Sequence, residues 1–167
     1  MIRGGLLGVG VLTFALLTSV AAAQESRDGE ALVVAATSGN TINVQFTDGS
    51  AYTVRLIGVN APRIDAPDIG TECYGLEARD FLSDLVTGTT VRLEREVSDA
   101  SATGRLLRHV WVRDANTGAE IPLAVILVSQ GYTEADAIPP DTMMAEQLAA
   151  LDADARSRGI GRWGACP

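Results

Sequence analysis

The feature that most constrains the fold is a series of short apolar or alternating segments separated by tight turns in the first half of the chain. Alternation of apolar and polar residues is typical of a half-buried β-strand, and a DG pair between two such segments is typical of a hairpin. The turn sequences SGN and TDGS separate the segments. The pattern predicts a three-stranded meander with strands at 31–37, 41–46 and 51–59.

A helix and two further strands are predicted after a proline-containing loop. Apolar residues recur at helical spacing over 75–88, and Gly88 ends the pattern. Alternation then predicts strands over 89–97 and 105–112, with a turn between them.

Two helices are predicted in the last third of the chain. Pro122 and Gly131 bracket a short apolar helix. The last helix covers 141–159, with Asp141 as its expected N-cap and one apolar stripe along its length. Three strands, a helix, two strands and two helices predict an α+β fold that is mainly β, namely a five-stranded OB-fold barrel with three helices.

The N-terminus has the pattern of a secretory signal peptide. Arg3 precedes an apolar run that ends in three alanines before Gln24. An uncleaved membrane anchor is the alternative, but the run is short for a full span. We therefore expect export to the periplasm or the medium, with no membrane contact after cleavage. The expected organisation is a signal peptide over 1–23, a flexible lead-in over 24–30 and one domain over 31–167.

Charge and cysteine content limit the partners and the redox state. The formal net charge is −8, and all 13 basic residues are arginines. A chain this acidic is not expected to bind long duplex DNA, although a local basic pocket could hold a small phosphate-bearing ligand or a nucleic-acid end. In an exported chain, Cys73 and Cys166 are expected to form one disulfide. A redox or metal pair is the alternative, but there is no CxxC motif and only one histidine.

Six motifs occur in order along the chain: SGNT, VRLIGVNAP, ECYGLEA, TGRLLRHVWV, VSQGY and RGIGRWGAC. In this order and spacing they resemble the staphylococcal nuclease (thermonuclease-like) family over about residues 32–163. The resemblance implies calcium-dependent hydrolysis of DNA and RNA. Two carboxylates would hold the metal, a glutamate would activate water and two arginines would clamp the phosphate. Secreted members carry cysteines near YG and after the final Trp, and Cys73 and Cys166 match these positions.

The resemblance places this chemistry on positions that have lost their acids. The clamp arginines fall on Arg55 and Arg105, the metal carboxylates on Asn40 and Asn60, and the glutamate on Arg63. Arginine stays protonated and is a poor general base, and a calcium site without a carboxylate would be very weak. We therefore expect no metal and no cofactor at these positions, and phosphodiester hydrolysis that is lost or strongly impaired. What remains is a phosphate-binding pocket of Arg55, Arg105 and Arg63.

Two other hypotheses stay open. In one, the chain is an active nuclease whose calcium site has moved to Asp65 and Asp68, with Glu72 as the base. In the other, it is a protein-interaction module that has kept only the fold. A simpler interpretation of the pocket is also possible, in which Arg55 and Arg105 pair with these same acids.

Three other residues are interpreted as structural. His109 lies in a predicted strand with no partner acid visible in its motif, so a catalytic role is not expected. Trp111 and Trp163 are expected to pack in the core and against the C-terminal tail.

Overall fold

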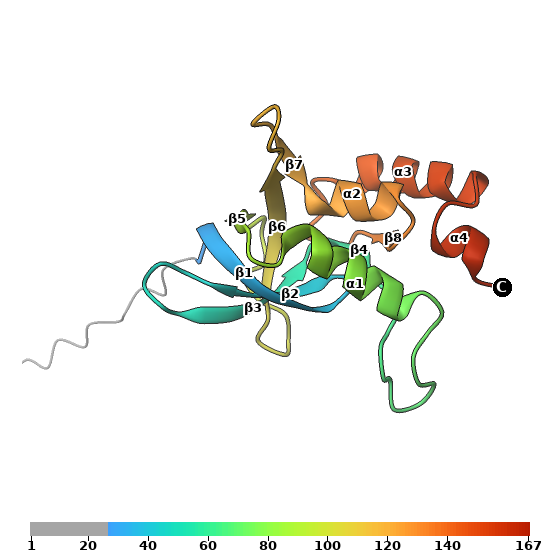
Figure 1. The fold of residues 1–167 in the computed structure, drawn as a ribbon, viewed down its shortest axis with the longest axis horizontal. Helices are drawn as coiled ribbons and strands as arrows, with labels where there is room; N and C mark the ends of the chain where they lie inside the picture. Colours follow the sequence, from blue (N-terminus) through green and yellow to red (C-terminus); the bar gives the residue numbers. More distant parts are fainter. Residues whose placement is uncertain (1–26) are drawn as a thin grey trace, which may run out of the picture.

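The computed structural model describes residues 27–167 (Figure 1). The expected signal peptide over 1–23 and the start of the expected lead-in lie outside the described residues. Within 27–167, no helix has the length and hydropathy that a membrane span requires.

Five strands form a closed mixed barrel, which confirms the predicted OB-fold architecture. β1 pairs with β2 and β2 with β3 in an antiparallel meander, and β5 pairs with both β1 and β6. A parallel pairing of β3 with β6 closes the barrel, and closure leaves few unpaired strand edges. The barrel strands are β1 (Gly29–Ser38), β2 (Thr41–Gln45), β3 (Ala51–Leu56), β5 (Thr90–Glu94) and β6 (Leu106–Arg113).

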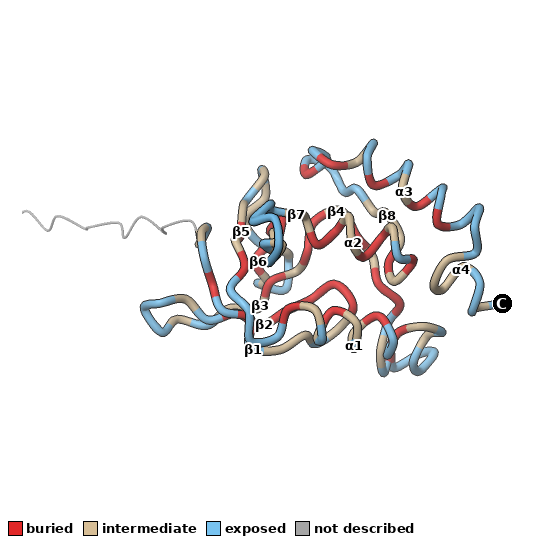
Figure 2. The backbone as a smooth tube through the Cα atoms, turned by 45° about the horizontal axis from the view of Figure 1, so that its top comes forward, coloured by how far each residue is buried: buried red, intermediate tan, exposed pale blue. Residues whose placement is uncertain are grey.

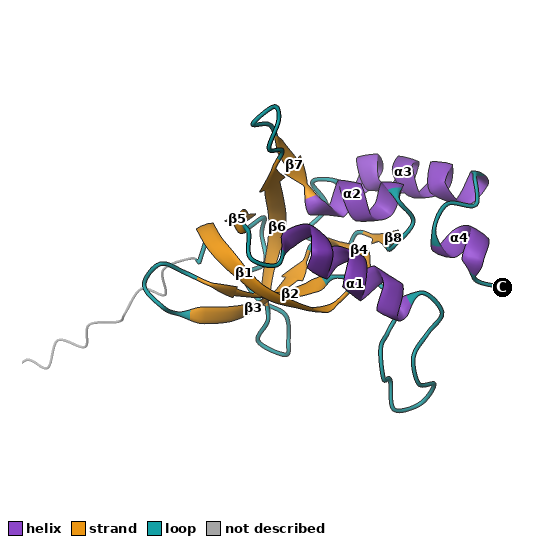
Figure 3. Cartoon of the chain, in the orientation of Figure 1, coloured by secondary structure: helices purple, strands orange, loops and turns teal. Residues whose placement is uncertain are grey.

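The three predicted helices are present and are followed by a one-turn helix. Figure 3 shows α2, α3 and α4 gathered at one end of the barrel, while α1 lies across its strands. β7 (Glu120–Pro122) extends the sheet beyond β6, and β4 (Gly58–Asn60) pairs with β8 (Glu134–Asp136) in a separate small sheet. The helices are α1 (Gly75–Val86), α2 (Leu123–Ser129), α3 (Ala145–Ser157) and α4 (Arg162–Ala165).

The hydrophobic core fills the barrel and the space under the helices. Figure 2 shows the buried residues concentrated along the barrel strands and on α2. Val33 and Val54 from the barrel, Leu82 from α1 and Leu127 from α2 belong to one buried cluster. Burying each such side chain stabilises the fold by roughly 1.5–3 kcal/mol.

The third predicted strand is broken, and the break creates β4. Gly58 has a φ of +84°, a left-handed conformation that does not continue an extended strand and that favours glycine. The chain therefore turns after Leu56, and Asn60 pairs with Glu134 instead of continuing β3. This turn moves Asn60 to the edge of the barrel, beside the C-terminal half of the chain.

Two boundary predictions are corrected by the structure. β1 begins at Gly29, within the expected lead-in, because Gly29 pairs with Leu93 of β5. Asp141 is not the N-cap of α3, which begins at Ala145. Its Oδ1 atom instead accepts the backbone N–H groups of two residues, Val97 and Ser98, at 2.8 and 2.9 Å.

His109 has a partner acid that its motif did not reveal. The buried Nε2 atom of His109 lies 2.9 Å from a carboxylate oxygen of Glu96. The other oxygen of Glu96 accepts the backbone N–H groups of Thr142 and Met143. The pair therefore ties β6 to the segment before α3, which is a structural role.

Both tryptophans form cation–π contacts with arginine side chains. The guanidinium carbon of Arg92 lies 4.8 Å from the ring centroid of Trp111, and that of Arg156 lies 3.6 Å from the ring centroid of Trp163. A cation over an aromatic face at such distances is attracted by the ring quadrupole.

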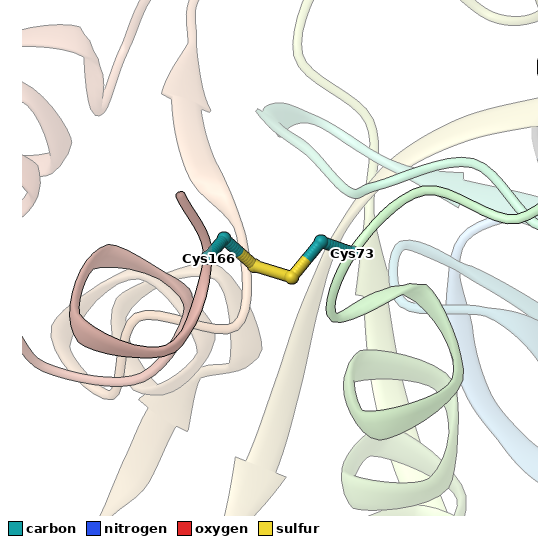
Figure 4. The surroundings of a disulfide bond; sticks show 2 residues. All are labelled: Cys73 and Cys166. Carbon is teal, nitrogen blue, oxygen red and sulfur yellow. A yellow bond between two sulfur atoms is a disulfide. The ribbon is translucent and has the colours of Figure 1, made fainter.

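The predicted disulfide between Cys73 and Cys166 is confirmed (Figure 4). It joins the loop just before α1 to the residue that follows α4, and the two cysteines are 93 positions apart in the sequence. A loop of this length corresponds to roughly 4–5 kcal/mol of stabilisation in the chain-entropy treatment.

Candidate phosphate-binding site

One surface hollow brings together six of the residues singled out from the sequence. We call it the arginine hollow; its volume is about 430 Å³. Asp68, half of the alternative calcium site, is not part of its lining. The six residues are Asn40, Arg55, Asn60, Arg63, Asp65 and Arg105.

Barrel closure places the two clamp arginines beside one another. Arg55 lies on β3, opposite Leu107 of β6 in the parallel register. Arg105 lies two residues before Leu107, and alternate residues of an extended chain face the same side. The two positive charges are close enough that Arg105 contributes to the lowered pKa of Arg55.

Neither arginine of this pair is neutralised by an acid. Of the twelve arginines within 27–167, nine form ion pairs with carboxylates. Arg55 and Arg105 do not; the other exception is Arg95. Arg55 contacts Oδ1 of Asn60 at 3.5 Å, and Nε of Arg105 donates to the hydroxyl of Thr103 at 3.2 Å. The hollow therefore holds two positive charges without a carboxylate partner among the described residues.

Burial further favours an anion at Arg55. Burial is the largest cause of its lowered pKa, the charge of Arg105 adds to it, and the carboxylate of Asp136 opposes it. A buried positive charge with a like charge nearby is stabilised by any anion that enters. Burial and the charge of Arg105 thus both act against the charged form of Arg55.

The interpretation that the acids of the neighbouring loop pair with Arg55 and Arg105 is wrong. Asp68 and Glu72 lie within ion-pair distance of Arg63 instead. Asp65 accepts a hydrogen bond from the hydroxyl of Thr71 at 3.2 Å.

Asn40 is a structural residue at the β1–β2 turn. Its side chain is buried, and Nδ2 donates to the carbonyl of Val59 at 3.3 Å. Only the NH₂ end of an amide can donate, so this bond fixes the orientation of the side chain. Oδ1 then accepts the hydroxyls of Ser38 and Thr41 at 3.0 and 3.2 Å. Its two lone pairs are thus already used.

Asn60 is held between a positive and a negative side chain. Its Nδ2 donates to Oε1 of Glu134 at 3.0 Å, which leaves Oδ1 facing Arg55. Glu134 also lies within ion-pair distance of Arg156 and Arg162, at 3.4 and 3.8 Å. Sequence reasoning missed Glu134, because nothing in its short polar segment indicated a strand that pairs with β4.

Arg63 is bound to its own loop. Its backbone N–H donates to Oε2 of Glu72, and its Nε lies 3.3 Å from Oε1 of the same residue. The backbone hydrogen bond is the main cause of the lowered pKa of Glu72, and the Arg63 side chain adds to it. Arg63 lines the hollow, but its charge is already paired, and exposed pairs of this kind contribute little to stability.

The residues of the hollow do not fit a calcium ion. Calcium requires six to eight oxygen ligands, usually including carboxylates. Here the amide oxygens of Asn40 and Asn60 already accept hydrogen bonds, and the oxygen of Asn60 faces the positive charge of Arg55. Among the residues that the structure describes, no group of three or more histidine, cysteine, aspartate or glutamate side chains is placed to hold a metal.

Comparison with known proteins shows the family to which the chain belongs. Residues 53–165 match a family model described as "Staphylococcal nuclease homologue". The chain is 36% identical to the thermonuclease of Staphylococcus hyicus over 80 residues, which is 48% of this chain and 47% of the enzyme. It is 28% identical to the thermonuclease of Staphylococcus intermedius over 132 residues, which is 79% of this chain and 74% of that enzyme. The chain thus spans about half the length of the first relative and about three quarters of the second. Because the family model covers more than half of the chain, including β5, β6 and all four helices, the chain belongs to the staphylococcal nuclease homologue family.

Proposed function

We propose that this domain binds a phosphate-bearing group, such as a nucleotide or a nucleic-acid end, in the arginine hollow and does not hydrolyse it. One observation carries the proposal. Arg55 and Arg105 line one hollow without a carboxylate partner within 27–167, while the positions expected to hold a metal are amides that are already hydrogen-bonded.

Guanidinium groups suit this role. Arginine presents a planar set of N–H donors that can contact two phosphate oxygens at once, and it stays charged at any ordinary pH. Two such groups side by side can neutralise a phosphate dianion. The partial burial of Arg55 strengthens the attraction, because water screens a half-buried charge less than an exposed one.

The same residues are poorly suited to hydrolysis. A water molecule must lose a proton to attack a phosphodiester, and a carboxylate or a metal ion usually assists this step. Asp65 is the only carboxylate among the described lining residues, and it already accepts a hydrogen bond from Thr71. The active-nuclease alternative needs Asp68 as well, but this residue pairs with Arg63 and lies outside the lining.

We also propose that the chain acts after export. The disulfide between Cys73 and Cys166 supports this, because such bonds persist in oxidising compartments. The signal-peptide pattern at the N-terminus supports it as well. Mass spectrometry of the chain secreted by its host would test the proposal. A mature N-terminus at Gln24 is expected, and retention of the intact chain in the cytoplasm would contradict it.

Calorimetric titration of a nucleoside bisphosphate in the presence of EDTA tests the binding proposal. Binding to the wild-type chain is expected, and Arg55→Ala or Arg105→Ala should weaken it roughly tenfold or more, because each removes a charge-assisted contact. Arg95→Ala is the matched control. Arg95 is exposed, has no ion pair within 27–167 and lines neither this hollow nor its neighbour. The proposal fails if nothing binds in EDTA, or if Arg95→Ala weakens binding as much as Arg55→Ala.

The protein-interaction hypothesis gives a different result in the same titration. If only the fold has been kept, Arg55 is not needed for the function. Arg55→Ala would then leave the affinity for a protein partner unchanged, and the wild-type chain would not bind the bisphosphate.

A further inference from the structure

A second hollow of about 290 Å³ adjoins the arginine hollow and shares Arg55 and Arg105 with it. We call it the apolar hollow, because Leu56, Val59 and Leu107 form much of its wall. A ligand whose phosphate lies on the arginine pair therefore has a neighbouring space for the rest of its structure. The polar groups in that space decide which ligand fits best.

Two carboxylates line the apolar hollow, and one of them has no hydrogen-bond or ion-pair partner among the described residues. Asp141 is buried, and its Oδ1 atom accepts two backbone N–H groups. Asp136 is half-buried, and its carboxylate forms no hydrogen bond or ion pair with any described residue. Asp136 is thus the carboxylate of this hollow that has no partner among the described residues.

The backbone holds Asp136 in place near the arginine pair. It lies on β8 and pairs with Gly58 of β4. Gly58 follows Arg55 by only three residues, so this pairing brings Asp136 close to Arg55. Its carboxylate is close enough to oppose the lowering of the pKa of Arg55, yet it is too far away to form an ion pair with that side chain. The lining of the apolar hollow therefore carries two positive charges and, near Arg55, one negative charge without an ion-pair partner among the described residues.

This charge arrangement discriminates between ligands. A phosphate ester without a hydrogen-bond donor would leave Asp136 unpaired and would be repelled by it. An ester with an amino or ammonium group could satisfy both sides of the site. A hydrogen bond to a charged group contributes more than one between neutral groups.

Building on the proposed function, we propose that Asp136 makes this site selective for phosphate monoesters that also carry an amino or ammonium group. Two kinds of molecule share this chemistry. One is a small phosphorylated amino alcohol, and the other is a nucleotide whose base has an exocyclic amino group.

Two matched ligand pairs separate these sources. Phosphoethanolamine and ethyl phosphate differ in the ammonium group, and cytidine and uridine monophosphate differ in an amino group on the base. Each is titrated in EDTA against the wild-type chain, Asp136→Asn and Asp84→Asn, with inorganic phosphate as a reference for the arginine pair alone. Asp84 is a matched control, since it is exposed on α1, forms no ion pair within 27–167 and lines neither hollow.

The wild-type chain should prefer the amino-bearing member of at least one pair by roughly tenfold, the effect of one hydrogen bond to a charged group. The pair that shows the preference identifies the source. Asp136→Asn should abolish the preference and bind inorganic phosphate a few times more tightly, because it removes a negative charge beside the arginines. Asp84→Asn should behave like the wild type.

The proposal that Asp136 confers selectivity is overturned if inorganic phosphate binds but neither ligand pair shows a preference for its amino-bearing member. It is also overturned if that preference survives in Asp136→Asn. Retained phosphate binding also shows that the variant has folded. If inorganic phosphate and all four esters fail to bind the wild-type chain, the proposed function itself is overturned. Failure of all binding is therefore distinguishable from binding without a preference between amino-bearing and amino-free ligands.

Discussion

Asn60 donates a hydrogen bond to Glu134 at 3.0 Å, across the two-stranded sheet formed by β4 and β8. The bond leaves the amide oxygen facing Arg55. The position that the family resemblance assigns to a metal-binding aspartate is therefore adapted to an amide. A carboxylate there would face the carboxylate of Glu134.

Restoring the acid should destabilise the protein. Asn60→Asp replaces a hydrogen bond with a like-charge contact, and the free energy of unfolding should fall by about 1–2 kcal/mol. Glu134→Gln alone should also destabilise the fold, because it weakens the contacts of Glu134 with Arg156 and Arg162. The double variant Asn60→Asp with Glu134→Gln should lose less than the sum of the two single changes, since the glutamine amide can donate to the new carboxylate. Urea unfolding of the wild type, both single variants and the double variant measures the coupling. Additive effects of the two changes would contradict the proposed contact.

The contact between β4 and α3 should make Gly58 intolerant of a side chain. A Cβ atom at Gly58 would lie 2.7 Å from Cδ1 of the buried Leu148, and the residue has a φ of +84°. Gly49 is a matched control, because it has the same φ and no atom within 4 Å of the added Cβ. Gly49→Ala should cost about 1 kcal/mol of strain, and Gly58→Ala roughly 1–3 kcal/mol more, because the core is overpacked. Equal losses in urea unfolding would show that Leu148 moves aside freely.

Asp141 should contribute to stability in a pH-dependent way. Burial raises its pKa, but hydrogen bonds from Ser98 and the backbone N–H of Val97 outweigh burial and lower it from the ordinary value of 3.8. A carboxyl whose folded pKa is lowered stabilises the fold above its ordinary pKa, and this contribution is lost as the pH falls through the folded value. Asp141→Asn should therefore cost about 1–2 kcal/mol near pH 7 and progressively less below pH 3.8. Urea unfolding at several pH values checks this, and a pH-independent difference would contradict it.

The disulfide should contribute more to stability than any single contact described above. Replacing both Cys73 and Cys166 by serine should lower the free energy of unfolding by about 4 kcal/mol, because the unfolded chain regains the freedom of a long loop. Reduction of the wild-type chain should give a similar loss, and the double serine variant should not respond to the reductant. Unchanged stability after verified reduction would show that the bond does not constrain the chain.

The sequence was sufficient to predict the elements whose signal is local. Alternation identified the strands that contain Val33 and Val54, and helical spacing identified the buried stripe of α1 around Leu82. Each pattern depends on neighbouring residues and on burial of one face, so it can be seen without knowledge of the fold. The family resemblance then added the positions of Arg55 and Arg105.

The residues that escaped prediction depend on contacts between distant parts of the chain. Glu134 and Asp136 lie on a three-residue strand, which is too short to show a period. Their importance comes from pairing with β4, which exists only because the chain turns at Gly58. The partner of His109 was missed for a similar reason, because Glu96 lies beyond the end of β5, in an irregular segment.

The most direct test of the central claim is a cleavage assay on single-stranded DNA and RNA. The disulfide-bonded chain is incubated with calcium, magnesium, manganese or EDTA, beside a thermonuclease as positive control. We predict no cleavage by this chain under any of these conditions, because the residues expected to hold a metal are hydrogen-bonded amides and Arg63 cannot act as a base. Metal-dependent cleavage that EDTA abolishes, and that Asp65→Asn with Asp68→Asn removes, would contradict the claim and would show that the catalytic site has moved to these acids.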